Sequence, residues 1–491
     1  MDFKLTGRFV NFFDLNKLTG RFSHNYNIII SIEIRRKKSK VNKKFFILVL
    51  VILMVFTGLN KTAAENLSFE EVLELGLKNN IQIKNSKLDY EIAEKDYEIA
   101  RRNLFPQISL ESSYTRMEEG PTTSIPIYMF QSKKREKLVP IDTITREGPQ
   151  GNYSTSISIN QPLYAGGRIR LGVDQAEQGK ELTKIQSEQK ESEILFQIIQ
   201  SFYNLLMAED RVQIEKDALE LVQEHKRIAR SSFEAGTAIK TDVLKAEIEE
   251  SKARQRLLEA QNQLSLARER LGNLIGIEEQ FSISPPQQEP ELELEFKNLL
   301  EQALNNRPEF QSLQMNQKLT KTKLELEEKS FYPSFYLNGN YSQQGSDFSP
   351  GEGSWTLTIS GSMSLYQGGK SSRKQSKIKK QLQQLKQQQS SLKQNIKLEV
   401  RQKIMAIEEN KQNIKVQNLN LTKAQENLEL ENKRFKTGVG KSVEVLNAQT
   451  TLKQTRISAS QAELKYEQSL YELLQKIGKL TDYVEEVVDN E

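Results

Sequence analysis

The strongest constraint on the fold is a long sequence pattern that occurs twice within the 491 residues. A Leu-Tyr-x-Gly-Gly segment occupies residues 163–167 and again 365–369, and a Phe-x-x-Gly segment occupies 233–236 and 435–438, both at an offset of 202 residues. Two copies of so long a period indicate a duplicated domain and not a solenoid of short units. We therefore expect two halves that repeat one order of elements.

A second pair of motifs places an insertion in the first half. An aromatic residue followed by Pro occurs at Pro106 and again at Pro333, at an offset of 227 residues instead of 202. The first half thus carries 25 extra residues, which fall within 115–152. This segment contains four prolines and a basic cluster, so we predict a long surface loop that is either a binding feature or a tolerated insertion. The basic cluster consists of Lys133, Lys134, Arg135 and Lys137.

Each half contains a pair of short segments in which apolar residues alternate with Ser, Thr or Asn. In the first half Ile108 and Leu110 show the pattern, and in the second half Leu337, Trp355 and Leu357 repeat it. A period of two predicts strands with one apolar and one hydrophilic face. The pattern fits a soluble sandwich with hidden apolar faces and also a barrel with lipid outside and water inside, and it leaves both possible.

The segments after the strands predict unusually long helices. Residues 168–229 contain no Pro, residues 370–434 contain neither Pro nor Gly, and the apolar residues of the second segment recur at steps of three, four and seven. At about 1.5 Å per residue each helix would reach roughly 90 to 100 Å, with the narrow apolar stripe of a coiled coil. We expect these helices to form the wall of a water-filled tube, and an ordinary bundle or fibrous coiled coil is the alternative. Thr241 and Ser442 are expected to begin the return helices.

The amino terminus has the order of a secretory signal. A basic stretch, 35–44, precedes the apolar run 45–56 and the small residues 62–64. An apolar run of 12 residues is short of the roughly 20 that span a bilayer, so we favour a removable leader over a permanent anchor. Without residues 1–64 the net charge is about −4, which gives no reason to expect a nucleic-acid partner.

The composition leaves little material for catalysis. The chain has no Cys and only two His, which excludes disulfides and thiolate chemistry and nearly excludes a histidine metal site or a serine triad. We expect His225 to lie on a solvated helix face. The run 438–442 resembles a phosphate-binding loop, but Phe435 stands where the motif needs Gly, and a helix precedes it where a strand is required. We therefore predict no enzyme activity, cofactor or metal.

Together, the leader, the two strand pairs, the helical hairpins and their shared motifs resemble the TolC family of outer-membrane efflux proteins. The resemblance implies a mainly α fold with a small β part, in which duplicated long helical hairpins form a tunnel and four strands per chain contribute to a trimeric transmembrane β-barrel. The motifs that carry it are the strand-opening Pro106 and Pro333, the strand-to-helix turns at Gly166, Gly167, Gly368 and Gly369, and the hairpin tips at Phe233, Gly236, Phe435 and Gly438.

The resemblance also implies a function, a location and partners. It predicts an export duct in the outer membrane that extends into the periplasm, is embedded in outer-membrane lipid, and works with an inner-membrane transporter and a periplasmic adaptor (membrane fusion protein). The hairpin tips would then dock the adaptor. The rival interpretation is a trimeric coiled-coil structural or adhesive surface protein with a membrane base, which explains the long helices but not the recurring strand pairs.

Two acids stand at equivalent places in the halves. Asp242 and Glu444 each lie six residues after the tip glycine, and the family resemblance implies that they line the periplasmic entrance constriction. The alternative is that acids in a first turn complement the helix dipole. The sequence departs from the family pattern at Lys245 and Asn447, which weakens the expected acidic ring.

These patterns divide the chain into five parts. The predicted boundaries are a leader at 1–64, a first repeat at 65–281 with its hairpin tip near 234–242, a linker at 282–293, a second repeat at 294–480 with a strand pair at 333–365 and a tip near 436–444, and a carboxyl-terminal tail at 481–491.

Overall fold

The computed structural model describes most of the chain after the predicted leader. The described residues are 65–119, 122–130, 138–147, 150–278, 280–286, 288–345 and 353–489. They belong to one compact unit, Ala64–Glu491. The predicted leader and the basic cluster of the insertion lie outside the described residues.

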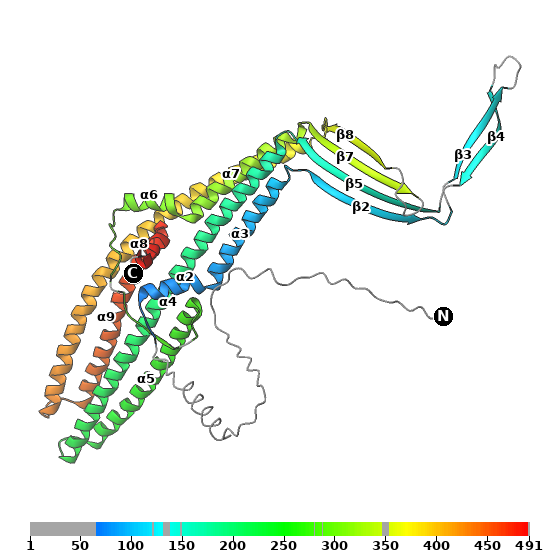
Figure 1. Ribbon diagram of the computed structural model, residues 1–491. Coiled ribbons are helices and arrows are strands. Elements are labelled where there is room, and N and C mark those ends of the chain that lie inside the picture. The colour runs from blue at the N-terminus through cyan, green and yellow to red at the C-terminus, as the bar shows by residue number, and fades with distance from the viewer. Residues whose placement is uncertain are drawn as a thin grey trace, which may run out of the picture. The chain divides into compact units, whose positions relative to one another are not determined.

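The helices follow the same order in both halves. Those of the first half are α2 (Phe69–Asn79), α3 (Ile81–Arg102), α4 (Arg168–Glu234) and α5 (Lys240–Ile275). Those of the second half are α6 (Phe296–Asn306), α7 (Pro308–Glu328) with the short η1 (Lys329–Phe331), α8 (Lys370–Lys436) and α9 (Ser442–Ile477), followed by α10 (Leu480–Asp489). The helices α4 and α8 each contain 67 residues, so each is about 100 Å long. Figure 1 shows α4, α5, α8 and α9 running side by side.

Four strands form one antiparallel sheet in the order β2-β5-β7-β8 (Figure 1). Their bounds are β2 (Gln107–Arg116), β5 (Gly151–Tyr164), β7 (Ser334–Gly345) and β8 (Ser354–Ser362). A separate short pair, β1 (Glu65–Leu67) and β6 (Phe281–Ile283), is parallel, so the predicted linker at 282–293 begins inside a strand. The fold class is confirmed: mainly α, with a small β part whose four-stranded sheet takes two strands from each half.

The expected long loop at 115–152 is wrong in part, because it contains a second hairpin. Strands β3 (Thr122–Phe130) and β4 (Leu138–Glu147) pair antiparallel. They form a separate sheet and lie in the chain between β2 and β5, whose ladder ends where Arg116 pairs with Gly151 and the Met117 N–H donates to the Gln150 carbonyl at 2.7 Å. The prolines indicated a loop, but both strands of an isolated hairpin are edges, where a residue without an N–H is tolerated.

The expected carboxyl-terminal tail is also wrong, because residues 480–489 form helix α10. Leu480 and Val484 are fully buried. They join the main hydrophobic core, where Phe69 and Phe202 meet edge to face with ring centroids 4.9 Å apart. That core draws side chains from both halves, including Tyr471 of α9 and Ile396 of α8. The two repeats therefore share one core and do not form separate domains.

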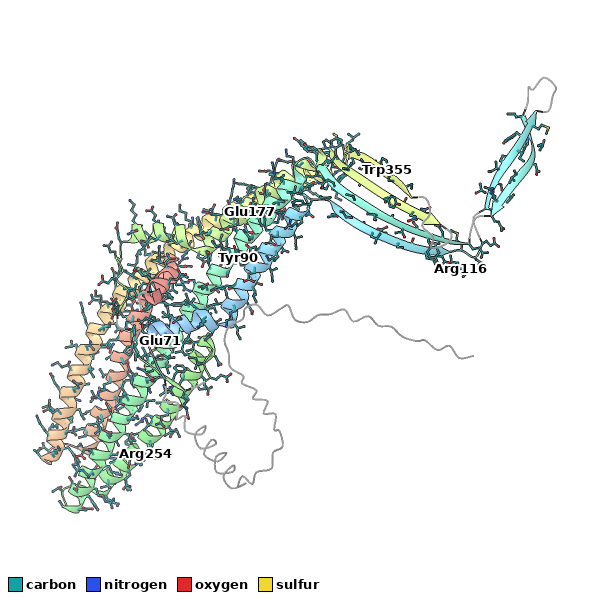
Figure 2. The ribbon with its side chains drawn as sticks, in the orientation of Figure 1. Glu71, Tyr90, Arg116, Glu177, Arg254 and Trp355 are labelled. Carbon is teal, nitrogen blue, oxygen red and sulfur yellow. The ribbon has the colours of Figure 1, made fainter. Side chains whose placement is uncertain are left out.

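The four-stranded sheet has one apolar face that nothing covers within the described residues. A row across the sheet pairs Leu110 with Ile157, Ile157 with Tyr341, and Tyr341 with Trp355. Trp355, labelled on β8 in Figure 2, is 75% exposed, and Leu110 is 68% exposed. The sandwich alternative would bury these side chains, so it does not describe this sheet.

The other face of the sheet is hydrophilic. Ser109 and Ser158 lie on it with their hydroxyls 2.7 Å apart, and Asn338 donates to Ser360 at 3.0 Å. Among the described residues, no helix is both long and apolar enough to cross a lipid bilayer.

Candidate functional site

The candidate site consists of the two tight turns that join α4 to α5 and α8 to α9. Gly236 and Gly438 both have a φ of 78°, a left-handed conformation that glycine adopts without strain. Each turn also repeats its backbone bonds: the N–H of the glycine donates to the carbonyl of Phe233 or Phe435 at 3.0 Å. A Cβ at either glycine would meet no atom within 4 Å, so the backbone angle and not a lack of space requires glycine.

Of the two predicted starts of the return helices, Ser442 is confirmed and Thr241 is off by one residue. Helix α5 begins at Lys240 and α9 begins at Ser442, after the extended residues Ile239 and Lys441. Thr241 thus lies inside a helix. The Ser442 hydroxyl does not cap its own helix, because it is used in a contact with α4.

Asp242 and Glu444 both lie in the first turns of their helices and are partly exposed. Glu444 already has local partners: its Oε2 accepts from the backbone N–H of Lys441 at 3.2 Å and lies 3.9 Å from Nη2 of Arg434. These contacts fit a helix-capping acid. Both Lys245 and Asn447, the departures from the family pattern, are exposed.

The tip aromatics differ in their surroundings. Phe233 is exposed, and the Lys240 ammonium lies 5.6 Å from its ring centroid. Phe435 is half-buried, and its ring centroid is 5.0 Å from that of His225. The second tip is therefore packed on α4, while the first tip is bare.

His225 is not on a solvated face as expected, because it is only 2% exposed. Its Nε2 lies 2.8 Å from the hydroxyl oxygen of Ser442, a residue that is itself 1% exposed. Burial lowers the pKa of His225, and the negative charge of Asp242 partly offsets this effect. The sequence contained a signal for this position: His225 stands three residues after Val222 and four before Ala229, both buried, and so lies on the apolar stripe of α4.

An ion pair joins α4 to α5 at the residue that follows His225. The Lys226 ammonium lies 2.5 Å from Oε2 of Glu250, and Arg254, labelled in Figure 2, lies 2.7 Å from Oε1. These charge-assisted hydrogen bonds lower the pKa of Glu250 to about 2. The pair holds the first hairpin closed on itself.

A row of polar contacts joins α4 to α9 between the core and the tips. Glu215 is fully buried, with Lys453 of α9 at 3.4 Å, and Asp217 pairs with Arg456 at 3.0 Å. Glu215 is a further residue with a sequence signal, because it lies three residues after the buried Val212. These contacts hold α9 against α4 at a position between the main core and the tips.

The remaining predicted residues lie at the junctions of sheet and helices. Pro106 and Pro333 directly precede β2 and β7, where a missing N–H costs no ladder bond. Gly166 and Gly167 join β5 to α4, and Gly368 and Gly369 precede α8; all four have φ between 61° and 81°. A Cβ at Gly166 would lie 2.4 Å from Cβ of Tyr332, so this turn packs against the helix end before β7.

The described residues contain no group of three His, Cys, Asp or Glu side chains that could hold a metal ion. The tips contain partly exposed carboxylates that can attract cations, an exposed aromatic ring that can contact another protein, and a buried imidazole that can bind a proton.

Comparison with known proteins identifies the family. A family model described as outer membrane efflux protein matches residues 72–277 and 299–479. The probable efflux pump outer membrane protein TtgC of Pseudomonas putida is 23% identical over 428 residues, which cover 83% of this chain and 82% of TtgC. The cobalt-zinc-cadmium resistance protein CzcC of Cupriavidus metallidurans is 26% identical over 136 residues, which span 28% of this chain and only 32% of CzcC.

A solved structure has the same fold. The CmeC outer membrane channel of Campylobacter jejuni superimposes with a TM-score of 0.68 at 15% identity, covering 86% of this chain and 89% of CmeC. The duplicated hairpins, the bare sheet and these matches lead to one conclusion: the chain belongs to the outer membrane efflux protein family.

Proposed function

We propose that this chain forms the homotrimeric outer-membrane duct of a tripartite export system, which conducts substrate passively from an inner-membrane transporter and its periplasmic adaptor to the exterior. The observation that carries the proposal is the sheet of β2, β5, β7 and β8, with one bare apolar face and continuations into helices of 67 residues. Four strands cannot close a barrel, for which about eight are needed. Several copies must therefore combine, and both edge strands, β2 and β8, are available for pairing.

Bare helix faces support assembly as a closed ring. Exposed apolar side chains follow α5 at Leu244, Ile248, Leu258 and Leu266, and α8 at Leu398, Met405, Val416, Leu419 and Leu430. Within the described chain α5 packs on α4 and α8 packs on α9. If α5 of one copy meets α8 of the next, a single heterologous contact covers both faces and closes after a fixed number of copies. Three copies would supply twelve strands.

The hairpin tips are the proposed entrance and adaptor-docking surface. In a trimer, Asp242 and Glu444 would contribute six carboxylates, and a ring of this kind favours cations. The exposed residues around Phe233, Gly236 and Gly438 would contact the adaptor. The existing cap contact of Glu444 favours the alternative, a purely structural acid, for that one residue.

The rival function is a coiled-coil surface stalk. It would need the sheet only as a base and gives no reason for antiparallel return helices α5 and α9. A duct requires both the sheet and the return helices, because the return helices double the number of helices that surround the tunnel. The match to an efflux pump outer membrane protein over 83% of the chain also favours the duct.

Planar-bilayer conductance of the purified full-length protein tests this function. We expect discrete channels that prefer cations, and we expect the double variant Asp242→Ala with Glu444→Ala to lose most of that preference while still conducting. If the double variant forms channels with unchanged selectivity, the proposed acidic ring is contradicted, but the proposed duct is not. Protein that inserts but never conducts would contradict the duct itself.

A further inference from the structure

We propose that His225 positions the second hairpin tip as a proton-sensitive latch, which holds the start of α9 against α4 and releases it when the surrounding solution becomes acidic. This inference rests on the proposed function, because the released element is the proposed entrance of the duct. It assigns a role to a buried side chain that lies beside, and not within, the predicted acidic ring.

The latch joins parts of the chain that are far apart in sequence. The imidazole of His225 and the hydroxyl of Ser442 are 217 residues apart and 2.8 Å from each other. The same imidazole packs on Phe435, which precedes the turn, so one side chain of α4 contacts both sides of the second tip. Beside it, Val445 is 0% exposed and belongs to a small apolar cluster with Leu428 and Leu452.

Protonation would weaken this arrangement. The neutral ring can either accept from or donate to the Ser442 hydroxyl through Nε2, and its Nδ1 is buried without a partner among the described residues. The imidazolium would carry N–H groups on both nitrogens, and the Nδ1 donor would then be buried without an acceptor, which is costly. The contacts from α8 and α9, Phe435 and Ser442, are uncharged.

The neighbouring charges do not cancel this cost. From α5, Asp242 favours the imidazolium, yet burial has the larger effect and the pKa is lowered. On α4 itself, Lys226 pairs with Glu250 and Glu224 pairs with Arg227 at 2.7 Å. The latched state therefore prefers neutral His225, whereas a released, hydrated imidazole has a pKa of about 6.5. Latching is strongest above that value and is lost as the pH falls below it.

The latch is present at the second tip and not at the first, and the contacts that hold the rest of α9 on α4 do not depend on it. At the positions 202 residues away, Asn427 and Lys240 replace the His and Ser, and Lys240 lies over Phe233 instead. Further from the tip, Gln449 donates to the Leu221 carbonyl at 3.0 Å. That contact and the ion pairs beyond it contain no histidine, the side chain that ordinarily titrates between pH 5 and 8.

Thiol labelling tests the latch directly, because the natural chain has no cysteine. In the full-length protein, Val445→Cys reports exposure of the buried start of α9, and Val439→Cys, at a position that is 75% exposed, is the matched control. The ratio of the two labelling rates with a water-soluble methanethiosulfonate removes the intrinsic pH dependence of the thiol. We expect this ratio to rise by about threefold or more between pH 7.5 and 5.5.

Two further variants separate a latch from a general loosening of the structure. When His225→Gln is added to both cysteine variants, the labelling ratio should no longer rise at pH 5.5, because the Gln amide can still reach a hydroxyl but does not titrate. Adding Ser442→Ala should raise the ratio already at pH 7.5 and reduce its pH dependence. A wild-type ratio that stays flat with pH, or an equal rise in the His225→Gln background, would overturn the latch.

Conductance distinguishes this failure from failure of the proposed function. With a working duct and latch, acidification should increase single-channel opening in the wild type and not in His225→Gln. Channels with equal pH dependence in both would contradict the latch and keep the duct. Absence of any channel would contradict the duct, while the labelling ratio would still decide whether His225 holds the tip.

Discussion

The two hairpin tips have the same backbone and opposite surroundings. Both turns place glycine at a φ of 78° after a Phe three residues earlier. The first tip leaves Phe233 exposed, while the second packs Phe435 on His225 and buries Ser442. This comparison shows that the duplicated motif determines the backbone conformation of the turn, whereas the contact of α9 with α4 determines the surroundings of the second tip. The first tip has no such contact, because the outer face of α5 is bare within one chain.

The largest expected effect concerns the feature that the tips share. Gly438→Val and Gly236→Val should each destabilise their tip by about 2 to 3 kcal/mol, because a β-branched residue is strained at this positive φ. Export should weaken while the β part still assembles. The measurement is amide hydrogen exchange at the tip together with drug export from cells.

The control for the glycine variants is Gly438→Asn, since Asn tolerates the left-handed region better than other residues. It should retain more export than Gly438→Val. Unchanged export in Gly438→Val would contradict the proposal that the adaptor docks at this tip.

The next effect should separate the tips. Phe435→Ala should destabilise the second tip by about 2 kcal/mol, because a half-buried ring is removed from His225 and its apolar neighbours, and Phe233→Ala should cost the first tip less than about 1 kcal/mol. Hydrogen exchange of the purified full-length protein in detergent compares the two. Equal losses would mean that the packing difference between the tips has no energetic consequence.

The smallest effect is a pH dependence confined to the first hairpin. The pKa of Glu250 is lowered to about 2 by Lys226 and Arg254. A carboxylate with a lowered pKa stabilises the folded state above its ordinary pKa of 4.5, and this contribution is lost as the pH falls toward 2.

Glu250→Gln should therefore lower the stability of the α4–α5 hairpin near neutral pH by about 1 kcal/mol, and the difference from wild type should vanish near pH 2. Hydrogen exchange of α5 amides at several pH values measures it. A difference that is constant with pH would show that the ion pair is not its source. The second hairpin serves as an internal reference, because it lacks this pair.

Much of the fold could be predicted from the sequence because its signals are local. The absence of Pro and Gly indicated the long helix 370–434, and alternation indicated strands around Leu110 and Leu357. The hairpin β3–β4 was missed because Pro126 and Pro140 suggested a loop, although proline is compatible with the edges of a two-stranded hairpin. Helix α10 was missed because its apolar residues gain meaning only from the core that Leu480 and Val484 enter.

The site was less predictable than the fold. The glycines at the turns could be found because positive φ favours one residue type. The burial of His225 depends on which helix covers its face of α4, and the covering helix, α9, begins 217 residues away at Ser442. A histidine on an apolar stripe was the available signal, and the polar composition around it favoured the opposite interpretation.

The most direct test of the account asks where the two faces of the sheet lie in a membrane. Leu357 of β8 lies on the bare apolar face, and Asn340 of the paired strand β7 lies one register position away on the hydrophilic face, so single cysteines at the two positions compare the two faces. In proteoliposomes, we expect the Leu357→Cys thiol to react with a lipid-soluble maleimide and to be protected from a charged one. The Asn340→Cys thiol should react with the charged reagent and then reduce conductance. Equal reaction of both thiols with the charged reagent, without an effect on conductance, would contradict the claim that this sheet separates lipid from a water-filled duct.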